Sequence, residues 1–178
     1  MKVIKKIGPP SGFRRFLLRL PIHLYRMGLG WVLGDRLLLL HHLGRISGKA
    51  RSVVLEVVEH DNASNSFVVA SGWGPTAAWY RNVVETPDVT INVGRRNLDV
   101  TALPLTKEEG ADVFVRYAAR HPKAAKSVLP RLMGYSVDGS EADFREFGLR
   151  LPFVRLVPRA NTWPKTPQVD QQTALSQQ

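Results

Sequence analysis

The residues best suited to chemistry in this sequence lie in a basic, glycine-containing segment at positions 44–51. It reads Gly-Arg-Ile-Ser-Gly-Lys-Ala-Arg and separates two apolar stretches that are typical of strands. Its two glycines permit a tight connection in which backbone amides point at an anion, and Arg45, Lys49 and Arg51 supply positive charge beside it. The segment therefore predicts an anion-binding hairpin, with a solvated basic turn as the alternative.

Nucleophilic and metal chemistry find little support elsewhere in the chain. There is no cysteine, which excludes disulfides, thiolate metal sites and a thiol nucleophile. His41 and His42 are adjacent on a predicted strand, so their side chains point to opposite faces and do not readily share a metal. The other histidines, His23, His60 and His121, are scattered. We predict no metal site and no catalytic side chain.

Three motifs follow one another along the chain. They are the basic segment at 44–51, Val-Ala-Ser-Gly at 69–72, and Ala-Trp-Tyr-Arg-Asn at 78–82, the last placed shortly before Pro87. In this order and spacing they resemble the deazaflavin-dependent nitroreductase and quinone reductase family, over roughly residues 33–157. The three motifs together are more specific than any one of them alone.

The resemblance implies a split β-barrel that binds the deazaflavin coenzyme F420, whose reduced form donates a hydride to a quinone, a nitroaromatic or another electron-poor acceptor. The basic hairpin would hold the coenzyme's phosphate and oligoglutamate tail, and Ser71 and Gly72 would face its ring. Trp79 would pack under the cofactor loop, which Asn82 would brace by hydrogen bonds. The cofactor-binding residues that motif position implies are Arg45, Ser47, Gly48, Lys49, Arg51, Ala70, Ser71, Gly72, Trp79, Tyr80 and Asn82.

Several alternatives stay open beside this interpretation. Flavin mononucleotide is the alternative cofactor, and a non-catalytic binder of flavin, tetrapyrrole or lipid is the alternative function, because a fold does not determine function. Trp73, Tyr117 and Tyr135 are candidate contacts to the acceptor, although packing in the core or on the surface is the favoured explanation for each. Nucleic-acid binding is disfavoured, since the aromatic residues are not interleaved with basic ones along a strand.

The spacing of apolar residues predicts how these motifs are positioned. Short strands with few helices favour a mainly β fold, an antiparallel split β-barrel with peripheral helices, over parallel βαβ units. Thr106 and Glu109 have the spacing of a helix capping box. Strands are predicted at residues 37–40, 52–58, 67–70, 89–93, 98–105 and 151–157, and helices at 77–86, at 106–120 and from there to about 133.

Charge and the two ends of the chain complete the prediction. The 178 residues carry a formal net charge of +10, which indicates an anionic partner: a cofactor, a membrane surface or nucleic acid. Residues 1–30 are predicted as a basic amphipathic helical segment that packs on the barrel or contacts an anionic membrane. Residues 31–158 would form the barrel, and residues 159–178 a disordered polar tail. We expect a cytoplasmic protein, with a homodimer as one possible assembly.

Overall fold

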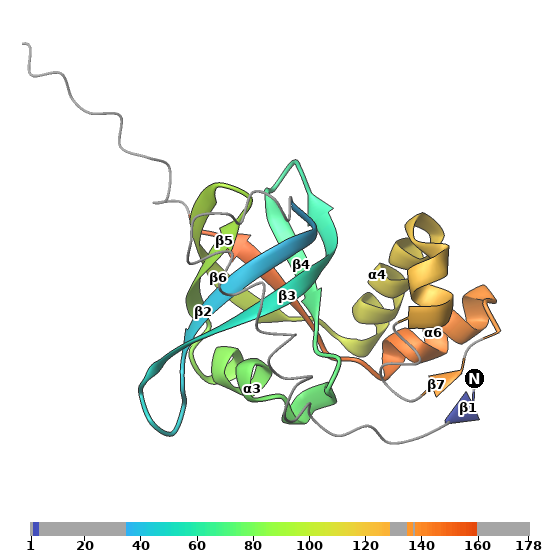
Figure 1. Cartoon of the computed structure of the whole chain (residues 1–178), viewed down its shortest axis with the longest axis horizontal. Coiled ribbons are helices and arrows are strands. Elements are labelled where there is room, and N and C mark those ends of the chain that lie inside the picture. The colour runs from blue at the N-terminus through green and yellow to red at the C-terminus, as the bar shows by residue number, and fades with distance from the viewer. Residues whose placement is uncertain (1, 4–34, 129–134, 137, 160–178) are drawn as a thin grey trace, which may run out of the picture.

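Six strands of the chain form a closed antiparallel barrel in the computed structural model, which describes residues 2–3, 35–128, 135–136 and 138–159 (Figure 1). The neighbours around the barrel are β2-β3-β4-β8-β6-β5, and β5 pairs with β2 to close it. The split-barrel fold class is thereby confirmed. The strands are β2 (Leu37–Leu43), β3 (Ala50–Asp61), β4 (Ser66–Ala70), β5 (Asp88–Val93), β6 (Arg96–Pro104) and β8 (Phe153–Pro158).

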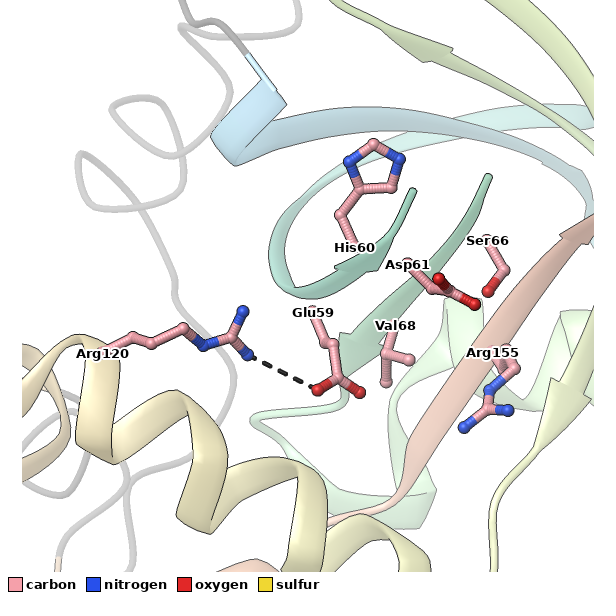
Figure 2. Close-up of a pocket in the computed structure, with 7 residues that line it drawn as sticks. All are labelled: Glu59, His60, Asp61, Ser66, Val68, Arg120 and Arg155. Atoms are coloured by element: carbon pink, nitrogen blue, oxygen red, sulfur yellow. Dashed lines mark ion pairs between the residues drawn. The ribbon is translucent and has the colours of Figure 1, made fainter. Parts of the chain in front are cut away.

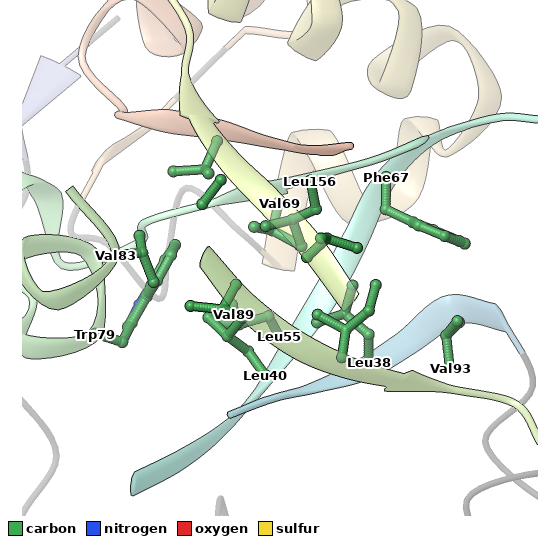
Figure 3. Close-up of a cluster of buried hydrophobic side chains, with 14 of the residues drawn as sticks. Leu38, Leu40, Leu55, Phe67, Val69, Trp79, Val83, Val89, Val93 and Leu156 are labelled. Atoms are coloured by element: carbon green, nitrogen blue, oxygen red, sulfur yellow. The ribbon is translucent and has the colours of Figure 1, made fainter. Parts of the chain in front are cut away.

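The alternation of side chains along each strand explains why the barrel forms. Successive strand residues point to opposite faces, so every second residue enters the interior. Leu38 and Leu40 of β2, Val93 of β5 and Leu156 of β8 are completely buried there (Figure 3). Burial of such a side chain contributes about 1.5 to 3 kcal/mol, so this interior is the main source of the barrel's stability.

Two predicted hairpins are confirmed, with strands slightly longer than expected. β3 and β4 pair across a turn in which Asn65 takes a positive φ of 51°, and the Asp61 carboxylate accepts a hydrogen bond from the Ala63 amide. β5 and β6 pair across a turn that begins at Gly94, whose φ of 56° suits a residue without a Cβ. Local turn chemistry thus sets the register of both hairpins.

The helices flank the barrel on two sides (Figure 1). α3 (Ala78–Glu85) ends before Pro87, as predicted. α4 (Lys107–Arg120) begins with the predicted capping box, in which Thr106 and Glu109 exchange hydrogen bonds. The predicted helical continuation beyond α4 appears as the short η3 (Ala124–Val128), and its remaining residues up to 133 lie outside the described part of the chain.

A further helix, α6 (Glu141–Leu149), was not predicted from the sequence. It packs against α4 so closely that a Cβ added to Gly148 would lie 2.7 Å from the Ala111 Cα. The aromatic rings of Phe114 on α4 and Phe147 on α6 meet there at 4.9 Å between centroids. The α4–α6 pair therefore forms a second apolar cluster outside the barrel.

Two short strands pair outside the barrel, and most of the predicted N-terminal and C-terminal segments lie outside the described residues. β1 (Lys2–Val3) pairs with β7 (Tyr135–Ser136). The predicted amphipathic helix within residues 12–30 and the predicted tail beyond residue 159 lie outside the described residues. Over the described ranges, no helix combines the length and the apolar character needed to cross a bilayer.

Candidate functional site

The loop that joins β2 to β3 closes on itself. The Gly44 carbonyl accepts hydrogen bonds from the amides of Ser47 (3.1 Å) and Gly48 (2.7 Å), and the Gly44 amide donates to the Lys49 carbonyl (2.9 Å). Gly48 adopts a φ of 61° within this turn. The expectation that the loop's backbone amides point at an anion is therefore wrong for these three amides. Their donors are used within the turn, so an anion bound here would be held mainly by side chains.

Arg45, Lys49 and Arg51, termed the hairpin cations below, remain exposed around this loop. Among the residues that the structure describes, none of the three has an ion-pair partner. Gly44 makes room for one of them, because a Cβ at Gly44 would lie 2.8 Å from the Arg51 Nε. Unpaired cations grouped on one loop produce a local positive potential that attracts anions.

Asn82 of α3 ties the hairpin loop to the rest of the protein. Its side chain is 3% exposed, and its Oδ1 accepts a hydrogen bond from the Arg45 amide at 3.1 Å. Its Nδ2 lies 3.0 Å from Nδ1 of His42, which is 7% exposed. Figure 1 shows α3 beside the β2–β3 hairpin, as these contacts require. The bracing of the loop by Asn82 that the resemblance implies is thus present in the structure.

His42 is buried at the base of the loop. Burial lowers the pKa of its imidazole, because desolvation disfavours the charged form, and the nearby Arg51 lowers the pKa further. His41, its neighbour on β2, contacts Ser52 and Asn92 instead. The two histidines therefore point to opposite faces, as predicted.

The loop between β4 and α3 contains Ser71, Gly72 and Trp73. Ser71 is completely buried, its amide donates to the Pro152 carbonyl (2.8 Å) and its hydroxyl to the Gly74 carbonyl (2.7 Å). A role for Ser71 facing a cofactor ring is not supported, because both of its donors are used to shape this loop. Gly72 is half-buried and Trp73 is 44% exposed, so these two residues are accessible to a ligand.

The other implied cofactor residues fall in different places. Trp79 is 6% exposed and packs in the barrel core beside Val83 (Figure 3), while the half-buried Tyr80 meets it edge-on at 6.0 Å. Ala70 packs against the α4–α6 cluster. Trp79 thus anchors α3 to the barrel core. Ala70 lies on the outer face of the barrel, toward α4 and α6.

The two tyrosines proposed as acceptor contacts are not brought to the hairpin. Tyr117 is 1% exposed within the α4–α6 cluster, and its hydroxyl donates to Glu56 Oε1 at 2.9 Å. Burial raises the pKa of this phenol well above its ordinary value, and the contact with Glu56 adds to the shift. Only the backbone of Tyr135 is described, in β7, where it pairs with Val3. Packing is the role that the structure supports for Tyr117.

A cavity of about 350 Å³ opens at the other end of β3 (Figure 2). It was not expected from the sequence, because its lining comes from the β3–β4 hairpin together with Arg120 of α4 and Arg155 of β8, which meet only in the fold. At about 3.3 Å per residue, the length of β3 separates it from the hairpin loop by roughly 30 Å. An ion pair between Arg120 and Glu59 lies at its rim. The lining residues are Glu59, His60, Asp61, Ser66, Val68, Arg120 and Arg155.

The structure is that of a small antiparallel barrel protein whose β2–β3 hairpin groups three exposed cations without ion-pair partners among the described residues. A family model described as "F420H(2)-dependent quinone reductase" matches residues 20–128, and the chain belongs to this family. The resemblance that the three motifs indicated is thereby confirmed. The matched region includes the hairpin loop and α3 but neither α6 nor β8.

Curated relatives carry the same description. The F420H(2)-dependent quinone reductase Rv1261c of Mycobacterium tuberculosis is 35% identical over 96 residues, which cover 50% of this chain and 63% of that protein. The putative F420H(2)-dependent quinone reductase Rv3178 of the same organism is 33% identical over 93 residues, 51% of this chain and 76% of its own. A solved structure described as an F420-H2 dependent reductase aligns at 24% identity and a TM-score of 0.47, covering 69% of this chain and 95% of its own. The chain thus spans less than two thirds of the first of these relatives.

Proposed function

We propose that this protein binds reduced coenzyme F420 at the β2–β3 hairpin and is a reductase of quinones or of similar electron-poor acceptors. Membership of the F420H(2)-dependent quinone reductase family supports the class of reaction. The observation that carries the placement of the site is the group of hairpin cations without ion-pair partners among the described residues.

The residues at the hairpin fit a ligand with several negative charges. Arg45 and Arg51 present planar guanidinium groups that suit phosphate and carboxylate, and Lys49 adds a mobile point charge. A phosphate followed by an oligoglutamate tail offers partners for all three cations. Flavin mononucleotide offers a single phosphate, so the arrangement favours F420.

The chain would contribute positioning and shielding. The bound coenzyme supplies the hydride, so the protein needs no nucleophile, which agrees with the lack of cysteine. The hairpin cations anchor the tail, and Asn82 holds the loop that carries them. Gly72 and Trp73 would border the ring, and the exposed indole would offer a flat apolar surface against which an aromatic acceptor can stack. Exclusion of water by such surfaces is what hydride transfer between two rings requires.

A side-by-side titration tests the proposal. The purified 178-residue chain is titrated with F420, flavin mononucleotide and NADPH, and binding is measured by fluorescence quenching. We expect micromolar or tighter binding of F420, weaker binding of flavin mononucleotide and no tight binding of NADPH. Oxidation of reduced F420 by menadione, followed by the return of deazaflavin absorbance, then tests catalysis.

Two outcomes would contradict the proposal in different ways. Tighter binding of flavin mononucleotide than of F420 would overturn the cofactor assignment. Tight F420 binding without turnover on menadione or a nitroaromatic would instead indicate a non-catalytic binder on the same barrel. Arg145→Ala is a matched control, because Arg145 pairs with Asp112 between α4 and α6 and should leave both measurements unchanged.

A further inference from the structure

The orientation of the Asn82 amide determines the protonation state of His42. The Arg45 backbone N–H can only donate, so the Asn82 atom that faces it at 3.1 Å must be the carbonyl oxygen Oδ1. The Asn82 NH2 group then faces His42 Nδ1 at 3.0 Å, and this nitrogen must accept. His42 is therefore neutral in this arrangement and carries its proton on Nε2.

We propose that His42 is a positioning residue for the hairpin, and that it holds the Asn82 amide in the orientation that supports Arg45 only while its Nδ1 is unprotonated. A proton on Nδ1 would place two donors against each other. The Asn82 amide relieves this by rotating, which presents Oδ1 to His42 and turns Nδ2 toward the Arg45 N–H. The hydrogen bond that ties the loop to α3 is then lost.

The surroundings of His42 support two such states. On β3, Arg51 is the direct strand partner of His42 and disfavours its charged form. His41, the neighbour of His42 on β2, acts in the same direction. α3 contributes the uncharged Asn82, and the charged Arg81 and Glu85 of that helix are exposed. The Leu43 carbonyl lies 3.5 Å from His42 Nδ1 and offers a protonated ring only a weak acceptor. Neutral His42 is thus favoured near pH 7, and acidification drives the change.

The consequence for the proposed site is a pH-dependent hairpin. Arg45 is the first of the hairpin cations after β2, and its amide is the atom that Asn82 holds. Release of this amide lets the cation-bearing loop sample more conformations, so a bound polyanion must order it again. This effect on the coenzyme rests on the proposed function, whereas the coupling of His42, Asn82 and Arg45 does not.

The coupling is tested first in the free protein by NMR. In the wild-type chain, we expect the proton of His42 on Nε2 at pH 8. As the pH falls through the titration of His42, protection of the Arg45 amide from hydrogen exchange should drop roughly three- to tenfold, in step with that titration. A proton on His42 Nδ1 at pH 8, or an Arg45 amide whose protection does not change while His42 titrates, would overturn the proposal without any variant.

Two variants test whether the pH response of the Arg45 amide comes from His42 or from a general effect of low pH on the protein. His42→Asn places a non-titrating oxygen close to the position of Nδ1, so protection of the Arg45 amide should no longer depend on pH. His41→Asn removes the adjacent, oppositely directed histidine and should behave as the wild type. A pH response that persists in His42→Asn would contradict the assignment to His42.

Binding of F420 to the same three proteins gives the second measurement. The affinity of wild-type protein, divided by that of His42→Asn at each pH, cancels the titration of the coenzyme itself. We expect this ratio to fall roughly three- to tenfold from pH 8 to pH 5. A constant ratio would overturn the link to the site. If F420 does not bind at any pH, the proposed function fails, and the NMR result alone decides the role of His42.

Discussion

The two ends of β3 handle charge in opposite ways. At its end near the α4 helix, Glu59 accepts two hydrogen bonds from Arg116, at 2.7 and 3.0 Å, and lies 3.5 Å from Arg120. At its beginning, the hairpin cations have no such partner among the described residues. Paired charges satisfy each other within the fold, whereas grouped unpaired charges are available to a ligand. The arginines of α4 are therefore engaged in ion pairs within the fold, whereas we propose that those of the hairpin serve binding.

The strongest test of this comparison removes two hairpin cations. Arg45→Ala combined with Arg51→Ala should raise the dissociation constant for F420 by at least about a hundredfold, because charge-assisted hydrogen bonds contribute on the order of 1.5 to 3 kcal/mol each. The free energy of unfolding should stay within about 1 kcal/mol, since exposed charges contribute little to folding. Fluorescence titration and urea denaturation measure the two quantities.

A salt series sharpens the same experiment. Binding by the wild type should weaken with added salt more steeply than binding by the double variant, because the variant has lost the charges that salt screens. Equal affinity and equal salt dependence for the two proteins would show that the hairpin is not the anion site.

Asn82→Ala tests whether the brace under the hairpin is needed. The change leaves the Arg45 amide and His42 Nδ1 without their shared partner, and an unsatisfied buried polar group costs about 1 to 3 kcal/mol. We expect both a lower free energy of unfolding in urea and weaker F420 binding. Unchanged binding in a destabilised protein would limit Asn82 to a structural role.

Glu59→Gln makes the matching change at the opposite end of β3. The partly exposed ion pair with Arg116 should contribute about 1 kcal/mol or less to the free energy of unfolding after screening by solvent, and F420 binding should not change. Hydrogen bonding to Arg116 lowers the pKa of Glu59 in the folded state. The unfolded chain therefore takes up the proton first, and the advantage of the wild type should disappear as the pH falls below about 4.3. A loss of F420 affinity in this variant would break the comparison.

The smallest expected effect concerns His42 and stability. Its pKa is lowered in the folded state, so the unfolded chain binds a proton first as the pH falls below about 6.5. Relative to His42→Asn, the free energy of unfolding of the wild type should fall as the pH drops below this value. Above it, the difference between the two proteins should be constant. Urea unfolding of both proteins between pH 5 and pH 8 measures the difference, and a difference independent of pH would contradict it.

Local sequence patterns were sufficient to predict most of the strands, the start of α4 and the family. Short apolar runs bounded by turn residues predicted the strands of both hairpins, and Thr106 with Glu109 predicted the start of α4, because turns and caps depend on residues a few positions apart. The three ordered motifs likewise indicated the family. α6 was not predicted, although Ser140 begins it with a local signal by accepting a hydrogen bond from the Asp143 amide. Its packing on α4, through Phe147 and the closely packed Gly148, depends on contacts that only the tertiary structure shows.

The hydrogen bonds that hold the candidate site in place could be seen only in the tertiary structure. Asn82 is 37 residues from Arg45 and 40 from His42 in the sequence, so no local pattern shows that one buried amide serves both. The same holds for the burial of Ser71 by its contacts with Pro152 and Gly74, and for the separation of Tyr117 from the hairpin. Hydrogen-bond partners depend on where distant elements meet, and a buried polar group is stable only where that meeting supplies its partner.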